Sequence, residues 1–488
     1  MKNAIALLAG AIFPLALAPF NLWPLGLVSI AAWFLLLRGA TVKQAMWLSF
    51  LFGLGKYGVG ASWVYVSIHD HGHAPVWLSV LLVSLFAAAM SLFTCAQGAI
   101  YAWLRRGEHL QQACVFAVVF VFSEWLLTWL FTGFPWLFAG YGHLDTVLVG
   151  YAPVGGVLLV GFVAAYSAAL WSQPKNILAL LAGLSLWIGG WILGLVQWTT
   201  IGKEQSVALV QGNIAQATKW LPENRSVIAQ HYQNLSQAHW QQDLIIWPEA
   251  ALTTFLHNAQ PLLDVLDKKG KETATGLILG IPGLERMPDD EVVFRNTAIG
   301  IGDAGGIYVK QHLVPFGEYV PMESLLRGLI KFFDLPMSHS RGGDSGQPPL
   351  QIKGGTAGLA ICYEIAYPDL VRQLAHNSEL LITLSNDTWF GHSIGPLQHM
   401  QMARMRAIEN GRYLLRATNN GVTAIVDHRG RILGRLDQFV DGVLVGHFRL
   451  TTNLTLYTQT GNWPLLALCL MVVLASRLYT PSSSRDKQ

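Results

Sequence analysis

Charge is the property that this sequence lacks most. Only 12% of its 488 residues are Asp, Glu, Lys or Arg, whereas a typical soluble protein has roughly 25%. Hydrophobic residues make up 52% of the chain, and the mean hydropathy is +0.39. These values exclude a disordered chain, a coiled coil and an ordinary water-soluble enzyme. Because residues 1–200 hold only 11 of the charged residues, we expect that part to lie in a membrane and a later part to lie in water.

Cysteine is also scarce, with four residues in the whole chain. Cys95, Cys114 and Cys469 lie in apolar stretches, which is typical of small core residues, so a disulfide framework is excluded. The net charge of +3 gives no indication of nucleic-acid binding. No metal-binding motif, phosphate-binding loop or Gly-x-Ser-x-Gly turn occurs, and we therefore expect neither a metal nor another cofactor.

Several segments are close to the length of about 20 apolar residues that a membrane-spanning helix needs. The first of them resembles a secretory signal peptide, but Pro19 and a second apolar segment follow it at once. We therefore interpret it as a span. The eight predicted spans are residues 4–19, 22–37, 45–66, 76–103, 113–131, 151–171, 177–197 and 464–478.

The basic residues predict the orientation of these spans. The short loops at 67–75 and 132–150 contain no Lys or Arg, which indicates the outer side of the membrane. Both termini are then cytoplasmic, and the polar block lies outside. The inner side holds Lys2, Arg38, Lys43, Arg105, Arg106, Lys175, Arg477, Arg485 and Lys487. The predicted parts are a membrane domain of seven helices (1–200), an external domain (203–450), an eighth transmembrane helix (463–480) and a cytoplasmic tail (481–488).

The polar block alternates strand-like runs with helix-like stretches, which favours a layered α/β domain. Helices are predicted from Pro368 and from Pro396 to Glu409, and Asn420-Gly421 predicts a hairpin. The predicted strands are Val207–Gln211, Leu244–Trp247, Gly276–Ile281, Thr297–Ile301, Ile307–Lys310, Gly358–Cys362, Leu380–Leu384, Tyr413–Ala417, Val422–Val426 and Gly442–Phe448.

Three side chains at the ends of these strands could carry chemistry. Glu249 is well placed as a general base, and Lys310 could stabilise an oxyanion. Cys362 precedes a helix, whose N-terminus favours a thiolate. Taken singly, each could instead be a surface charge or a structural cysteine. Glu318 lies in a Pro/Gly-rich loop beside the strand that ends at Lys310. Glu364 could orient the lysine or protonate a leaving group, and both glutamates could equally be surface charges.

The joint pattern resembles the carbon–nitrogen hydrolase (nitrilase) superfamily, whose Glu–Lys–Cys triad matches Glu249, Lys310 and Cys362. This resemblance implies an αββα sandwich. A domain of this kind outside the membrane, placed before the last of eight spans, looks like the apolipoprotein N-acyltransferase family of the bacterial inner membrane. That resemblance implies that residues 203–450 lie in the periplasm. One departure is that Leu127 and Thr128 stand where relatives often carry an Arg-Gly pair. Further matching segments are 18–24, 132–136, 211–214, 312–321 and 385–391.

The resemblance also implies a reaction. An acyl chain would pass from a phospholipid, for which we expect phosphatidylethanolamine, to Cys362 as a thioester, and then to the α-amine of a diacylglyceryl-cysteine on an apolipoprotein. Glu249 would be the base, and Lys310 would stabilise the oxyanion. Glu318 and Glu364 match acidic positions near the family's active site. Trp220 and Tyr363 match positions linked to substrate handling, and we expect a monomer.

Two alternatives stay open at this stage. A membrane-anchored amidase of the nitrilase type would use the same triad, although anchoring requires only one helix. A transporter or scaffold with a degenerate domain would need no triad at all. Full cellular function after Cys362→Ala would exclude both enzymatic interpretations.

Overall fold

The structure is a computed structural model that describes residues 1–287, 290, 292–319 and 340–478. Internal contacts divide the chain into two units. The first comprises Met1–Asp70, Ala74–Val196 and the segment from Thr460 onward, and the second comprises His71–His73 and Gln197–Gln459. The tail predicted at 481–488 lies outside the described residues.

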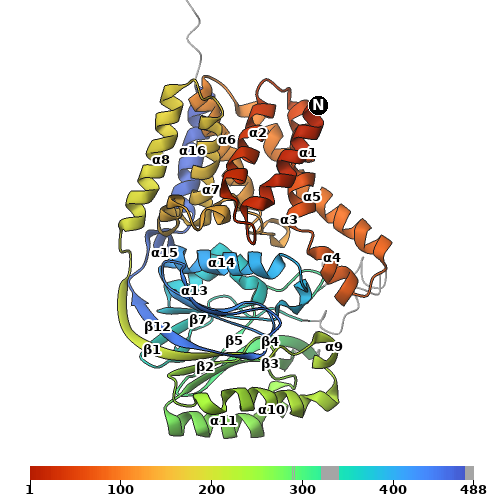
Figure 1. The fold of residues 1–488 in the computed structure, drawn as a ribbon, viewed down its shortest axis with the longest axis vertical. Coiled ribbons are helices and arrows are strands. Elements are labelled where there is room, and N and C mark those ends of the chain that lie inside the picture. Colours follow the sequence, from red (N-terminus) through yellow and green to blue (C-terminus); the bar gives the residue numbers. More distant parts are fainter. Residues whose placement is uncertain (288–289, 291, 320–339, 479–488) are drawn as a thin grey trace, which may run out of the picture. The chain divides into compact units, whose positions relative to one another are not determined.

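The first unit is built of helices (Figure 1). Among the described residues, four helical segments are long and apolar enough to cross a membrane: Val76–Leu104, His109–Leu126, Val147–Trp171 and Ile177–Leu195. Lys2–Ala16, Trp23–Leu37 and Trp463–Ser476 are shorter apolar helices, so the prediction of eight spans goes beyond these four. The main helices are α1 (Lys2–Ile12), α2 (Trp23–Leu37), α3 (Val42–Gly60), α5 (Val76–Leu104), α6 (His109–Leu126), α7 (Ala152–Trp171), α8 (Ile177–Leu195) and α16 (Trp463–Leu478).

Some helices in this unit end earlier than the sequence predicts. The α-helical part of the first predicted span ends at Ile12, and a 3₁₀ turn that contains Pro14 follows at Phe13–Ala16. Proline has no N–H to continue the α-helical hydrogen bonds. The span predicted at 45–66 is interrupted after Gly60, and a separate short helix, α4 (Val64–Val66), follows. The predicted last helix is present as α16 and packs against α5, α6 and α7.

The second unit is a sandwich of two six-stranded sheets (Figure 1). One sheet has the order β12-β1-β2-β3-β4-β5, and the other has the order β11-β10-β9-β8-β7-β6. Parallel pairs at the centre of each sheet are flanked by antiparallel ones. The strands are β1 (Thr200–Gln211), β2 (Leu244–Ile246), β3 (Gly276–Arg286), β4 (Val292–Gly302), β5 (Gly306–Val309), β6 (Leu350–Ile352), β7 (Gly355–Ile361), β8 (Leu380–Ser385), β9 (Tyr413–Thr418), β10 (Thr423–Val426), β11 (Ile432–Leu436) and β12 (Gly442–Thr452).

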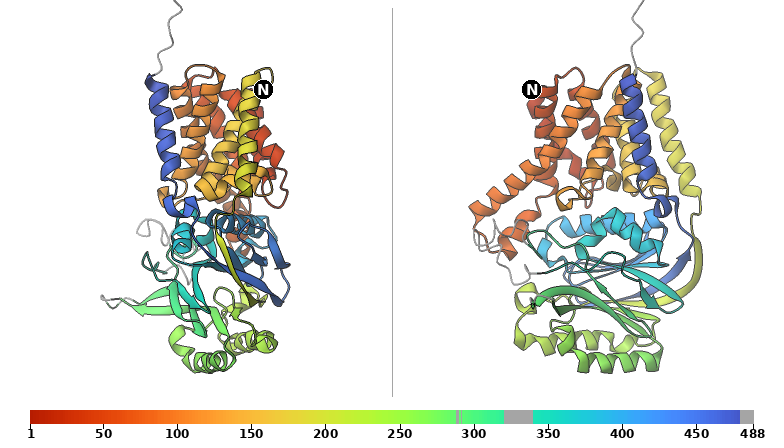
Figure 2. Two further views of the ribbon diagram at one scale, coloured as in Figure 1. Left: turned by 90° about the vertical axis from the view of Figure 1, so that its left-hand side faces the viewer. Right: turned by 180° about the vertical axis from the view of Figure 1, so that it is seen from behind.

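Successive side chains along a strand point to opposite faces of its sheet, and both faces are covered by apolar side chains. In β1, Val207 and Leu209 point into the core between the sheets, while Ala208 and Val210 point to the outer face. This is the two-residue period of a strand. Helices α10 (Arg225–Ser236) and α11 (Gln260–Thr273) cover the outer face of the first sheet, and α13 (Pro368–His376) and α14 (Gly395–Asn410) cover that of the second. Figure 2 shows the same order of layers from two more sides, and the αββα sandwich is confirmed.

All ten predicted strands overlap strands of the structure. Two further strands, β6 and β11, were not predicted, because neither is a continuous apolar run: β6 is Leu-Gln-Ile, and β11 is largely exposed. The predicted hairpin is confirmed by the antiparallel pairing of β9 with β10. Helix α13 begins at Pro368 as predicted, and α14 ends at Gly411, whose φ of 61° is left-handed.

Candidate active site

Glu249 lies just after β2, in a tight turn. Its carboxylate accepts a hydrogen bond from Asn296 Nδ2 at 2.7 Å and another from the Asn386 main-chain N–H at 2.8 Å. The next residue, Ala250, has a φ of 46°, which costs energy for a residue with a side chain. Gly280 on β3 makes room for this turn, because a Cβ there would lie 2.6 Å from the Ala250 nitrogen. The turn and its two donors therefore fix the direction of the Glu249 carboxylate.

Lys310, just after β5, is the cation of the site. Its Nζ lies 2.8 Å from the Glu318 carboxylate and 3.7 Å from Glu249 Oε1, and its side chain is 1% exposed. Burial alone would lower the pKa of Lys310, but the two carboxylates raise it well above its usual value. The ammonium therefore stays charged at any physiological pH, and Lys310 can stabilise negative charge but cannot act as a general base.

Glu318 is held by several donors. Besides Lys310, it accepts hydrogen bonds from the Val314 N–H at 2.8 Å and from Asn296 Nδ2 at 3.2 Å. Asn296 thus links the two carboxylates on either side of the lysine. Because these donors occupy both carboxylate oxygens, Glu318 fits the role of balancing the charge of Lys310 better than that of an acid or base.

Cys362 follows β7 directly, with a φ of 53°. Cys362 is partly buried. Desolvation and then the Glu249 carboxylate raise the pKa of the Cys362 thiol well above its ordinary value, although Lys310 acts in the opposite direction. The expectation that a helix N-terminus favours the thiolate is therefore wrong for the resting protein. The predicted short turn is a 3₁₀ helix of five residues, and the predicted helix, α13, begins only after it at Pro368. A base is needed to remove the thiol proton.

The hydrogen bonds of Glu364 indicate a structural role rather than the proton-donor role that the sequence suggests. Its carboxylate is fully buried and accepts hydrogen bonds from Tyr308 Oη at 3.0 Å and from the N–H groups of Gln311, His312 and Ile361 at 2.6–3.0 Å. It therefore joins the chain after Lys310 to the end of β7. Its oxygens are used in holding these two segments, so Glu364 positions Lys310 through the main chain, and the proton-donor role is not supported.

The two residues matched to substrate handling lie at the edges of this cluster. Trp220 is half-buried and follows α9 (Gln216–Lys219). Tyr363 is buried, and its ring lies 5.1 Å from that of Tyr367. Sequence reasoning missed Lys219, whose buried Nζ donates to the Glu249 carbonyl oxygen at 3.3 Å. In the sequence, only its position next to Trp220 could have indicated that Lys219 lies near the site.

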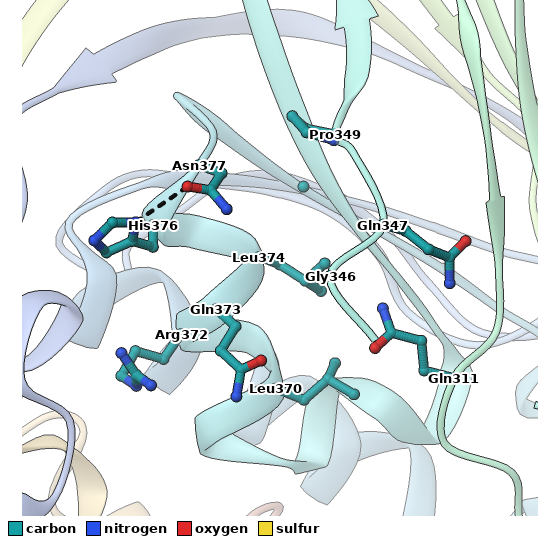
Figure 3. Close-up of a pocket in the computed structure, with 11 residues that line it drawn as sticks. Gln311, Gly346, Gln347, Pro349, Leu370, Arg372, Gln373, Leu374, His376 and Asn377 are labelled. Carbon is teal, nitrogen blue, oxygen red and sulfur yellow. Dashed lines mark hydrogen bonds between the residues drawn. The ribbon is translucent and has the colours of Figure 1, made fainter. Parts of the chain in front are cut away.

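The second unit also has a pocket of about 210 Å³ (Figure 3). Gln311, Gln347, Arg372 and Gln373 are among the residues that line it, and none of Glu249, Lys310 and Cys362 does. It therefore does not hold the reacting groups. Among the described residues, no group of three His, Cys, Asp or Glu side chains is arranged to hold a metal ion.

Comparisons with known proteins show the family to which the chain belongs. The model of the carbon-nitrogen hydrolase family matches residues 206–452, and that of the apolipoprotein N-acyltransferase N-terminal domain matches residues 9–170. An apolipoprotein N-acyltransferase of Pseudomonas aeruginosa (strain LESB58) is 44% identical over 99% of this chain and 97% of that protein. The chain belongs to the apolipoprotein N-acyltransferase family. The Vibrio cholerae apolipoprotein N-acyltransferase is 39% identical over 95% of this chain and 94% of that protein. Among solved structures, the C. elegans NitFhit protein matches with 17% identity and a TM-score of 0.41 over 55% of this chain and 65% of that one.

The raised pKa of Cys362 gives this family member a testable pH dependence. Only the thiolate reacts with iodoacetamide, so we expect the alkylation rate of Cys362 to rise with each step of pH up to pH 9 without a plateau. The measurement is the mass of the Cys362 peptide after timed quenching. Alkylated peptides from Cys95 serve as the internal reference. A plateau below pH 8 would show a thiolate that is already formed in the resting protein.

Replacing Glu364 with glutamine should destabilise the protein. The amide would turn an N–H₂ group toward main-chain N–H donors that now meet a carboxylate, and leaving buried donors without an acceptor costs about 1–3 kcal/mol each. We expect a lower melting midpoint in detergent and slower acyl transfer. Glu223→Gln, at an exposed position, is the matched control. An unchanged midpoint in Glu364→Gln would contradict the positioning role.

Proposed function

We propose that this protein transfers an acyl chain from a phospholipid to the α-amino group of the diacylglyceryl-cysteine of an apolipoprotein, with Cys362 as the acyl carrier. The observation that carries the assignment of residues is the buried Lys310 ammonium between Glu249 and Glu318, within electrostatic range of the Cys362 thiol. A thiol, a carboxylate base and a fixed cation are the groups that acyl transfer through a thioester requires.

The first half of the reaction loads the thiol. Glu249 takes the proton of Cys362, and the sulfur attacks the carbonyl carbon of the lipid ester. Negative charge then develops on the carbonyl oxygen, and the Lys310 ammonium stabilises it because this cation is already in place and dehydrated. When the C–O bond breaks, the proton held by Glu249 passes to the departing alkoxide. Lysophospholipid leaves, and the acyl chain remains as a thioester. Phosphatidylethanolamine is the donor that we expect.

The second half transfers the acyl chain to an amine. The α-amine of the acceptor attacks the thioester carbonyl, and the oxyanion again forms beside Lys310. Glu249 takes a proton from the attacking nitrogen as the amide forms and returns it to the departing Cys362 sulfur. The thiol and the carboxylate are thereby restored for the next cycle. Water must attack the thioester more slowly than the amine does. Otherwise the protein would hydrolyse the phospholipid ester instead of transferring the acyl chain.

The membrane part is consistent with this reaction, because both substrates are anchored in lipid. We propose eight spans, with both termini in the cytoplasm of a bacterium and the catalytic unit on the periplasmic side of the inner membrane. The absence of Lys and Arg from the loops at 67–75 and 132–150 supports this orientation. Alkaline phosphatase fused after residue 73 should be active and after residue 106 inactive, and the reverse pattern would contradict the orientation.

Transfer to a defined acceptor tests the proposed function. Purified full-length protein is mixed with phosphatidylethanolamine that carries a fluorescent acyl chain and with a peptide that begins with diacylglyceryl-cysteine. We expect fluorescence on the peptide. The matched control is the same peptide with an acetylated α-amine, which should stay unlabelled. Release of free fluorescent fatty acid, with an unlabelled peptide, would favour a hydrolase and overturn the proposal.

A further inference from the structure

His399 touches the main chain of Cys362 from the outer layer of the sandwich. It lies on α14, its ring is fully buried, and its Nε2 is 3.1 Å from the Cys362 carbonyl oxygen. Cys362 has a left-handed backbone conformation, which a residue with a side chain adopts only where surrounding contacts enforce it. His399 therefore contacts the peptide group of the residue whose strained backbone conformation requires support.

Asp387 and Arg416 support the imidazole from behind. Asp387 Oδ1 lies 3.1 Å from His399 Nδ1, and Asp387 Oδ2 lies 2.7 Å from an Arg416 guanidinium nitrogen. Ser385 at the end of β8 donates to Asp387 Oδ1 at 2.6 Å. Gly421 is required beside this carboxylate, because a Cβ there would lie 2.1 Å from Asp387 Oδ2. These groups are all buried and come from α14 and from segments at the ends of β8, β9 and the hairpin.

The surroundings indicate which nitrogen of His399 carries its proton. Burial and then the Arg416 cation lower the pKa of His399 below its ordinary value, so the ring is neutral at pH 7. The Cys362 carbonyl oxygen can only accept, so Nε2 carries the hydrogen that points at it. In the neutral ring Nδ1 then accepts from the Arg416 nitrogen at 3.1 Å, whereas Asp387 Oδ1, also 3.1 Å from Nδ1, receives no hydrogen from the ring.

We propose that His399 is a positioning residue for acyl transfer, which holds the Cys362–Tyr363 peptide through a hydrogen bond from Nε2–H to the Cys362 carbonyl. This inference rests on the proposed function. Fixing the peptide plane fixes the direction of the Cys362 side chain at one end and of the Tyr363 N–H at the other. His399 is not a base for the thiol, since its protonated nitrogen faces the carbonyl oxygen and its other nitrogen faces Arg416 and Asp387.

Glutamine and asparagine carry their amide nitrogen at different distances from Cα, so replacing His399 with each of them tests the hydrogen bond to Cys362. In His399→Gln the terminal nitrogen is as many bonds from Cα as Nε2 is in histidine, so it can still donate to the Cys362 carbonyl. In His399→Asn the nitrogen takes the place of Nδ1, and the bond to Cys362 is lost. His399→Ala loses both. The measured quantities are the rate of thioester formation at saturating fluorescent phosphatidylethanolamine, the KM for that lipid and the melting midpoint of the full-length protein.

We expect His399→Ala and His399→Asn to slow thioester formation on the order of 10²-fold with KM unchanged, because small misplacements of a reacting group have effects of this size. His399→Gln should recover most of the rate. Equal rates in wild type and His399→Ala would overturn the inference. Equal losses in Gln, Asn and Ala, each with a lowered melting midpoint, would assign His399 to stability alone and also overturn it. Absence of thioester in the wild type would instead contradict the proposed function.

Discussion

Replacing Cys362 with alanine should reduce acyl transfer on the order of 10⁵-fold or more, since loss of a covalent nucleophile has effects of this size. Without the sulfur, no thioester can divide the reaction, and direct attack of the amine on the lipid ester lacks a group to receive the acyl chain. The transfer assay with fluorescent phosphatidylethanolamine measures the loss. The fold should persist, because Cys362 is only partly buried at the edge of the core between the sheets.

Two variants make this experiment decisive. Cys95→Ala, in α5, removes a cysteine that has no proposed role and should keep full activity. Cys362→Ser keeps the size of the side chain, but an oxygen nucleophile is far harder to deprotonate than a thiol. It should therefore be nearly as inactive as the alanine variant. Retention of a tenth or more of the wild-type rate by Cys362→Ala would exclude a thioester at this position.

Replacing Lys310 with methionine should remove activity and stability together. The two carboxylates that now flank the ammonium, Glu249 and Glu318, would face each other without a cation. Removing one partner of a buried ion pair costs about 3–5 kcal/mol. Loss of oxyanion stabilisation should also slow thioester formation by about 10²–10³-fold. The melting midpoint in detergent and the rate of thioester formation measure the two effects.

A second substitution separates these effects. Lys310→Met combined with Glu318→Gln removes one of the two uncompensated carboxylates, so we expect part of the stability to return while the reaction stays slow. Lys268→Met is the matched control, since Lys268 is exposed and makes only a surface ion pair with Glu272 at 3.9 Å. Recovery of activity in the double variant would show that Lys310 serves the fold and not the oxyanion.

The sequence predicts the layers of the catalytic unit well because its strands are short apolar runs separated by turns. Glu249, Lys310 and Cys362 could be selected from the sequence because each stands at the end of a predicted strand. Strand ends tend to lie at one edge of a sheet, where such side chains can meet. The missing strands are those without this pattern. β6 has an exposed glutamine at its centre, and β11 is mostly exposed.

The supporting residues of the site could not be predicted in the same way. Asn296 contacts Glu249 from inside β4, and His399 reaches Cys362 from α14. Neither has a local signal, because both contacts join elements that are far apart in the sequence. Glu364 was predicted to be near the chemistry, but only the structure gives it main-chain partners. The thiol pKa was also misjudged, because desolvation and the Glu249 charge depend on tertiary packing.

Direct detection of the acyl-enzyme tests the central claim most closely. The full-length protein is incubated with phosphatidylethanolamine alone, and the mass of the intact chain and of its Cys362 peptide is measured before and after neutral hydroxylamine. The account predicts one added acyl chain on Cys362 in the wild type, its removal by hydroxylamine and its loss on addition of the diacylglyceryl-cysteine peptide. Transfer of acyl chain to that peptide without any acyl group on Cys362, at any time sampled, would contradict it.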